Sequence, residues 1–240
     1  MEIINFDLDN NTNVASVHHR LLPNSIRCII AGGSGCGKTN LLMNLLTRPG
    51  FLNYDRLHIY SKSLHQPKYQ LLQEWASQIN SCANTCDIIT FHTCSDIIPV
   101  EELNPRQRTI MVFGDVMLEK NQTPIEKYFS QGRHGGADCF YLCQSYFRIP
   151  KQAIRDNANL LILFKQDAKN LRAIHDTFVA GDMDFDEFRK FFSACTGLKY
   201  GFAVIDHSRE VDKGRYRCGF DQCYMPSGAI ARDIAHDNNN

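Results

Sequence analysis

One short segment near the N-terminus has the residue types and spacing needed to bind phosphate. It reads Gly32-Gly33-Ser34-Gly35-Cys36-Gly37-Lys38-Thr39 and fits G-x-x-x-x-G-K-[ST], the phosphate-binding P-loop. Glycines let successive backbone N–H groups surround an anion, Lys38 would reach the β- and γ-phosphates, and the Thr39 hydroxyl would ligate Mg²⁺. We therefore expect ATP and Mg²⁺ as cofactors, with nucleotide contacts from Gly32, Gly33, Ser34, Gly35, Cys36, Gly37, Lys38, Thr39 and Asn40.

The residues on either side of this loop provide the structural context that the motif requires. Residues 26–31 are apolar and predict a short buried strand. Residues 38–47 predict a helix with one apolar face, which Arg48-Pro49-Gly50 ends. A helix that begins directly after the loop adds the positive end of its dipole to the phosphate site, which argues against a chance glycine-rich turn.

A second candidate site follows the strongly apolar strand predicted over 108–113. Gly114 lets the chain turn, and Asp115 would then hold Mg²⁺ through water or polarise the attacking water. Hydrolytic sites of this kind usually have two acidic residues in succession, whereas this chain has Gly114 at the first position. Asp115 could therefore serve the metal, the water or both. Glu119, about one helical turn further on, is a weaker candidate for general base.

Gln144 is the candidate that depends on the order of the strands. It follows the strand predicted over 138–143. If that strand lies between the P-loop strand and the Asp115 strand, the protein belongs to the additional-strand ATPases, and Gln144 would face the γ-phosphate. An amide can donate to phosphate and accept from the attacking water. The alternative is a polar residue in a simple turn.

Arg133 is the arginine with the most suggestive surroundings, because it lies in the glycine-flanked segment 131–136. An exposed loop arginine is usually only solvated. At an interface between subunits, the same side chain could stabilise charge on the nucleotide of a neighbour. Arg148 and Arg155 compete for this role.

The alternation of the remaining elements predicts the fold class. Further strands are expected at 56–61, 87–91, 159–164 and 200–206, and helices at 67–80, 123–131 and 167–196 with a break near Gly181. This α/β pattern, with its P-loop, predicts a P-loop NTPase with a mainly parallel central sheet flanked by helices. We expect an N-terminal segment at 1–24, an ATPase domain at 25–210, and a C-terminal hairpin and tail at 211–240.

Composition limits the cellular setting. The chain has 26 basic and 26 acidic residues and a formal net charge of zero, so total charge gives no sign of nucleic acid. No apolar run approaches the roughly 18 residues of a membrane span, and the N-terminus lacks a signal-peptide pattern. A cytosolic or nuclear protein without membrane contact is expected.

Cysteine and histidine positions give weaker expectations. The ten cysteines are scattered through the chain, which favours reduced, buried thiols. The pair His18 and His19 has no nearby ligand partners, so we expect both on the surface. Four side chains that could bind a metal lie close together in the sequence over 82–94: Cys82, Cys86, His92 and Cys94. Their spacing fits no standard zinc pattern, which argues against a zinc site.

The order and the residues of these motifs resemble those of a known family. After the P-loop come Ile110-Met111-Val112-Phe113-Gly114-Asp115-Val116-Met117, Tyr128-Phe129-Ser130-Gln131-Gly132-Arg133-His134, Tyr141-Leu142-Cys143-Gln144-Ser145-Tyr146-Phe147, Ile149-Pro150 and the segment 157–165. Over residues 24–206 the chain is similar to the poxvirus-type genome-packaging ATPases of large DNA viruses, virophages and Polinton or adintovirus-like elements. These form a branch of the FtsK–HerA superfamily.

The resemblance implies a RecA-like additional-strand ATPase. It would work as a homo-oligomeric ring, a pentamer or hexamer, that uses ATP hydrolysis to move double-stranded DNA into a preformed capsid. Capsid vertex proteins would be partners, and the place of action would be viral assembly sites in host cytoplasm or nucleus, or the virion. Lys38 and Thr39 carry over as phosphate and Mg²⁺ ligands and Asp115 as the Walker B carboxylate. Gln144 carries over as the sensor glutamine and Arg133 as the arginine finger acting in trans.

Two alternatives remain at this point. A small-molecule kinase uses the same phosphate loop but needs no ring. A non-catalytic assembly protein could use nucleotide binding as a structural switch. The absence of a first acid at Gly114 favours this alternative. For the motor, Lys151 and Arg155 are expected to face DNA.

Overall fold

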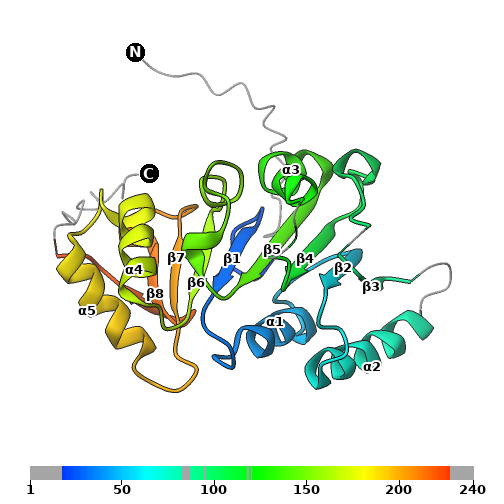
Figure 1. Ribbon diagram of the computed structural model, residues 1–240, viewed down its shortest axis with the longest axis horizontal. Coiled ribbons are helices and arrows are strands. Elements are labelled where there is room, and N and C mark those ends of the chain that lie inside the picture. Colours follow the sequence, from blue (N-terminus) through cyan, green and yellow to red (C-terminus); the bar gives the residue numbers. More distant parts are fainter. Residues whose placement is uncertain (1–17, 83–86, 95, 118, 120, 228–240) are drawn as a thin grey trace, which may run out of the picture.

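The described part of the chain forms one continuous sheet with helices on both faces. The computed structural model describes residues 18–82, 87–94, 96–117, 119 and 121–227 (Figure 1). In these residues nine strands form a single sheet in the order β3-β2-β4-β5-β1-β6-β7-β8-β9. The strands are β1 (Arg27–Ala31), β2 (Arg56–Ser61), β3 (Ile89–His92), β4 (Thr109–Gly114), β5 (Ala137–Cys143), β6 (Leu160–Leu163), β7 (Ala203–Asp206), β8 (Tyr216–Cys218) and β9 (Gln222–Tyr224).

The helices largely follow the predicted apolar periodicity. They are α1 (Lys38–Thr47), α2 (Pro67–Ser81), α3 (Thr123–Gln131), α4 (Ala168–Ile174) and α5 (Phe185–Thr196), and a five-residue π-helical segment, His175–Val179, extends α4. The expected break near Gly181 separates this extension from α5. Asp184 caps α5, since its carboxylate accepts a hydrogen bond from the Glu187 backbone N–H at 2.8 Å.

The predicted mainly parallel sheet is confirmed. Strands β3, β2, β4, β5, β1 and β6 run parallel, and β7, β8 and β9 add antiparallel strands at one end. The sequential pairing β7–β8–β9 makes the expected C-terminal hairpin part of the same sheet. All carboxyl ends of the parallel strands therefore meet along one edge, which we call the carboxyl edge; the opposite one is the amino edge.

Both faces of the central strands are buried, which explains why these strands are apolar throughout rather than alternating. Ile29 and Tyr141 face the core beneath α3, α4 and α5, whereas Ile30 and Phe140 face the core beneath α1 and α2. Figure 1 shows the same division, with α1 and α2 below the sheet and α3 above it. The sheet is thus a rigid platform from which loops project at its two edges.

The histidine expectation was wrong for His18. This side chain is 3% exposed, and its Nε2 lies 2.9 Å from the Asp138 carboxylate at the start of β5. The same carboxylate accepts a hydrogen bond from the Ile26 backbone N–H. The residues before β1 are consequently fastened to the sheet from His18 onward. Residues 1–17 of the predicted N-terminal segment and 228–240 of the predicted tail lie outside the described residues.

The expectation of reduced thiols was wrong for one pair of cysteines. Cys195 in the last turn of α5 and Cys218 at the end of β8 form a disulfide. Sequence spacing could not reveal this pair, because the contact arises only when α5 packs on the antiparallel end of the sheet. The buried cysteines Cys28, Cys139 and Cys143 are free thiols, as expected.

Candidate functional site

The P-loop joins β1 to α1 at the carboxyl edge, as predicted. Gly35 and Gly37 adopt left-handed backbone conformations, with φ of 73° and 114°. A Cβ on Gly32 would lie 2.7 Å from both the Cys36 Sγ and the Phe164 Cβ, so the first glycine is required by packing. Gly33 and Gly35 have open space around them. The backbone can therefore curve around a phosphate group without a side chain blocking its approach.

Lys38 lies over the loop that precedes it. Its ammonium donates to the carbonyl oxygens of Gly32 at 2.5 Å and Gly33 at 2.9 Å. Burial raises the pKa of the Cys143 thiol to about 12, and the nearby Lys38 charge opposes this rise. The lysine charge is thus held against the ends of β1 and β5, within the phosphate loop.

The donor set of this loop fits a nucleotide phosphate with Mg²⁺. Thr39 stands in the first turn of α1 and is half-buried, and Asn40 beside it is exposed. A threonine hydroxyl at this position and a carboxylate across the site are oxygen ligands of the kind Mg²⁺ prefers. Among the described residues, no group of three or more His, Cys, Asp or Glu is placed to hold a metal ion. Cys86, one of the four candidate ligands at 82–94, lies outside these residues.

Asp115 lies at the carboxyl edge directly after β4, and its side chain is exposed. It adopts a left-handed backbone conformation with φ of 55°, which is uncommon for a residue other than glycine. Strain of this kind persists where the surrounding structure holds the residue in place. The turn after β4 therefore presents the Asp115 carboxylate away from the sheet core.

Gln144 follows β5, and β5 lies between β1 and β4, which meets the condition set for an additional strand. The Gly32 backbone N–H donates to the Cys143 carbonyl at 3.1 Å, which puts the residue before Gln144 against the P-loop. Gln144 itself is exposed. The strand order thus gives Gln144 the expected position between the phosphate loop and Asp115.

Asn170 is a residue of this site that sequence reasoning missed. It is 5% exposed on α4, and its Oδ1 accepts hydrogen bonds from the Ser145 hydroxyl at 3.1 Å and the Phe147 backbone N–H at 2.8 Å. Asp167, the N-cap of α4, in turn holds the Asn170 amide. The loop after Gln144 is therefore fixed by a buried amide that no local motif indicates.

Glu119 has a different environment from Asp115. Its carboxylate lies 2.6 Å from the Lys62 ammonium. Burial raises the pKa of Cys94, and the charges of Glu119 and Asp115 add to that rise, which places both carboxylates near this thiol. The Lys62 ammonium occupies an oxygen of this carboxylate that a general base would turn towards water, so the geometry weakens Glu119 as a general base.

Arg133 lies at the opposite edge of the sheet from the P-loop. It is exposed in the 3₁₀ turn Gly132–Gly135, which precedes the amino end of β5. A seven-residue strand such as β5 spans about 23 Å. The side chain of Arg133 therefore cannot reach the phosphate loop of its own chain. Of its competitors, Arg148 is exposed, and Arg155 is half-buried with its guanidinium 5.2 Å from the centre of the Tyr146 ring.

Solved structures with the same fold come from archaeal viruses. The genome packaging NTPase B204 from Sulfolobus turreted icosahedral virus 2, in complex with AMPPCP, matches with a TM-score of 0.52 and 13% identity over 78% of this chain and 95% of that chain. The B204 complex with ATP-gammaS matches with a TM-score of 0.51 and 13% identity over 77% and 93%. The DNA-packaging ATPase B204 from Sulfolobus turreted icosahedral virus matches with a TM-score of 0.52 and 14% identity over 78% of this chain and 94% of that chain.

The fold and the loop at its carboxyl edge define a P-loop NTPase in which β5 lies between β1, which leads into the P-loop, and β4, which leads to Asp115. B204 has a similar fold. A search of curated proteins finds no match to the sequence. The model of the poxvirus A32 protein family matches residues 14–180, and the chain belongs to that family. The predicted resemblance to viral genome-packaging ATPases is confirmed. No helix among the described residues has the length and apolarity to cross a membrane.

Proposed function

We propose that this protein is an ATP-hydrolysing motor that moves double-stranded viral DNA into a preformed capsid. The observation that carries the proposal is the strand order β4-β5-β1. It brings the P-loop, Gln144 and Asp115 to one edge of the sheet and leaves Arg133 at the other. A site divided in this way suits hydrolysis at the boundary between two copies of the chain.

Within one copy, the residues at the carboxyl edge would bind ATP and prepare it for hydrolysis. The backbone of the P-loop and the Lys38 ammonium would hold the phosphates, and Thr39 with Asp115 would hold Mg²⁺. When bound, Mg²⁺ neutralises charge on the phosphate oxygens. Asp115 is also the best-placed carboxylate to orient water, because Glu119 is paired with Lys62. Gln144 would donate to the γ-phosphate and accept from that water.

The neighbouring copy would complete the site. Arg133 is exposed and lies beyond reach of its own P-loop, and the family resemblance implies a ring of five or six copies. In a closed ring, the amino edge of one copy can face the carboxyl edge of the next through a repeated head-to-tail interface. The Arg133 guanidinium would then stabilise charge on the transferred phosphoryl group.

The DNA contact would be independent of base sequence, since phosphate contacts alone suffice for translocation. A chain with zero net charge can present basic residues to a central channel if its acids face elsewhere. Lys151 is exposed and remains a proposed DNA contact, whereas Arg155 stacks on Tyr146 and is less available. Capsid vertex proteins would be the docking partners at viral assembly sites in the cytoplasm or nucleus.

One structural feature favours a second candidate, a nucleotide-switched assembly protein that does not hydrolyse ATP. Gly114 occupies the position where hydrolytic relatives have a first acid, so Asp115 is the only carboxylate directly after β4. A small-molecule kinase is the third reading of the same P-loop.

Hydrolysis in the presence of DNA separates these functions. We expect the unaltered chain to release phosphate from ATP without any phosphoryl acceptor, and double-stranded DNA to increase the rate several-fold. Lys38→Ala should abolish the activity while preserving the circular dichroism spectrum. ATP binding without phosphate release, with or without DNA, would favour the switch, and release only with a small-molecule acceptor would favour the kinase.

A further inference from the structure

A hollow at the amino edge of the sheet gathers arginines from four separate parts of the chain. It has a volume of about 570 Å³. Its arginines are Arg20 before β1, Arg27 at the first position of β1, Arg133 before β5, and Arg209 after β7. The other described residues that line it are uncharged: Leu22, Pro23, Asn24, Ser25, Asn159 and Ser208. We call this feature the arginine hollow.

Arg27 and Arg209 are held in place by hydrogen bonds that leave donor capacity free. The Arg27 Nε donates to the Asn157 carbonyl at 2.6 Å, and no described residue occupies its two terminal amino groups. The Arg209 Nε donates to the Asp206 carboxylate at 2.9 Å. Its terminal amino groups, each with two N–H donors, donate to the Arg20 carbonyl and to the Lys213 carbonyl at 3.4 Å. These anchors reduce the entropy that the side chains would lose when a ligand binds.

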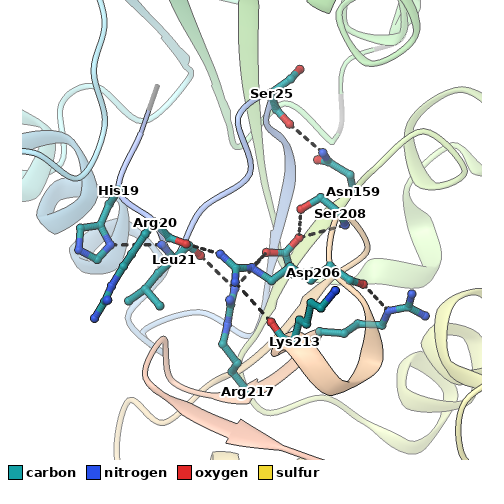
Figure 2. A network of polar contacts seen from close by, with 11 residues as sticks. His19, Arg20, Leu21, Ser25, Asn159, Asp206, Ser208, Lys213 and Arg217 are labelled. Carbon is teal, nitrogen blue, oxygen red and sulfur yellow. Dashed lines mark hydrogen bonds and ion pairs between the residues drawn. The ribbon is translucent and has the colours of Figure 1, made fainter. Parts of the chain in front are cut away.

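The network behind the hollow uses the buried carboxylate of Asp206 internally. Figure 2 shows Asp206 with Ser208 and Arg217 directed towards it. Asp206 is 0% exposed and bonds Ser208, Arg209 and the 1% exposed Arg217. Arg217 also donates to the Leu21 carbonyl. One carboxylate therefore faces two guanidinium groups, and the network keeps an excess of positive charge.

The remaining two arginines are available to a ligand. Arg20 and Arg133 form no ion pair with any acid among the described residues, and both are exposed. The chain as a whole has zero net charge, so four arginines around one hollow are a strong local concentration of positive charge. Planar guanidinium groups match the oxygens of phosphate in pairs, which makes a phosphate group the ligand chemistry that this hollow fits.

The size and position of the hollow indicate which phosphate. Its volume is that of a small-ligand site rather than of a long groove that follows a nucleic-acid backbone. One of its walls is Arg133. We propose that the arginine hollow binds the polyphosphate of the nucleotide held in the P-loop of a neighbouring copy of this chain, with Arg20 and Arg27 as additional ligands. This inference rests on the proposed function, since it assumes that neighbouring copies share a nucleotide site.

Inorganic tripolyphosphate tests the hollow without requiring hydrolysis or a ring. Lys38→Ala disables the P-loop, so calorimetry of that protein reports phosphate binding elsewhere. We expect it to bind tripolyphosphate, and we expect Arg20→Gln or Arg27→Gln, added to Lys38→Ala, to weaken binding by about tenfold or more. Arg189→Gln is the matched control, because Arg189 is an exposed arginine on α5 that pairs with Asp186, away from the hollow. It should leave binding unchanged.

Each alternative outcome has a definite meaning. If Lys38→Ala does not bind tripolyphosphate, or if Arg20→Gln and Arg27→Gln bind it as tightly as their parent, the hollow is not a polyphosphate site. If these substitutions weaken binding of a short DNA duplex but not of tripolyphosphate, the occupant is DNA and our assignment is wrong. An unaltered chain that hydrolyses no ATP but passes this binding test would overturn the proposed function and leave the phosphate site. A chain that hydrolyses ATP but fails the binding test would leave the proposed function standing and overturn the phosphate site.

Discussion

The Tyr69 hydroxyl lies 2.5 Å from the point where a Cβ on Gly114 would stand. Tyr69 comes from α2 and is 2% exposed, and Ser61 is the residue paired with Gly114 in the β2–β4 register. The space that a side chain at position 114 would need is therefore occupied by the hydroxyl of Tyr69 from α2. Glycine at 114 is a packing requirement of this chain as well as a departure from the usual pair of acids.

Gly114→Ala should destabilise the protein, because the new methyl group overlaps the Tyr69 hydroxyl. We expect a loss of about 1–3 kcal/mol in the free energy of unfolding, measured by chemical denaturation. In a Tyr69→Phe background the same substitution should cost clearly less. An equal cost in both backgrounds would show that the Tyr69 hydroxyl is not the obstacle.

Asp115→Asn should separate nucleotide binding from hydrolysis. Asp115 is exposed at the site, whereas Glu119 is paired with Lys62 at 2.6 Å. We expect Asp115→Asn to lower the rate of phosphate release by about 100-fold or more with ATP still bound, and Glu119→Gln to lower it by less than about tenfold. The reverse ranking in a phosphate-release assay would make Glu119 the general base.

A pair of histidines should make stability depend on pH. The Nδ1 of His58 lies 3.1 Å from the Nε2 of His92, and the Thr90 hydroxyl lies between them. Burial, together with the neighbouring His92 and Arg56, lowers the pKa of His58 to about 4. The unfolded chain, with an ordinary histidine pKa near 6.5, then binds more protons than the folded one. Stability should be complete above about pH 6.5 and fall progressively towards pH 4.

Denaturation curves recorded across this pH range provide the measurement. His58→Gln removes the group whose pKa is lowered to about 4 and should make the dependence shallower. His65→Gln is the control, since His65 is an exposed histidine outside this cluster. A His58→Gln variant whose stability falls with pH as steeply as that of the unaltered chain would contradict the prediction.

Reduction of the disulfide between Cys195 and Cys218 should loosen the attachment of α5 to β8. The two residues are 23 positions apart, and a loop of this length corresponds to about 3 kcal/mol of stability in the chain-entropy model. We expect a reductant to lower the thermal midpoint of the unaltered chain and to leave a Cys195→Ala, Cys218→Ala variant unaffected. Equal midpoints with and without reductant would show that the bond contributes nothing.

Local pattern predicted the elements around the P-loop to within a few residues. The phosphate motif fixes β1 and α1, and the apolar runs that end at Gly114 and Cys143 give β4 and β5. The order β4-β5-β1 was expected only conditionally from the residues, and the family resemblance is what favoured it. These inferences succeed where neighbours in sequence determine the structure.

Local sequence patterns could not predict the contacts between elements that are distant in the sequence. Nothing near Gly114 in sequence indicates that Tyr69 lies against it, and nothing near Gln144 indicates Asn170. The Cys195–Cys218 bond and the burial of His18 likewise depend on how remote segments pack. The arginine hollow is assembled from four segments and becomes visible only in the folded chain.

Complementation between two inactive variants tests most directly the claim that neighbouring copies share one ATPase site. Lys38→Ala cannot bind nucleotide but keeps Arg133, and Arg133→Ala keeps its P-loop but lacks the arginine. We predict that each alone releases little phosphate and that an equal mixture regains activity, because about one quarter of randomly formed interfaces combine an intact P-loop with an intact Arg133. A mixture no more active than its components, although the two proteins co-assemble, would contradict the account.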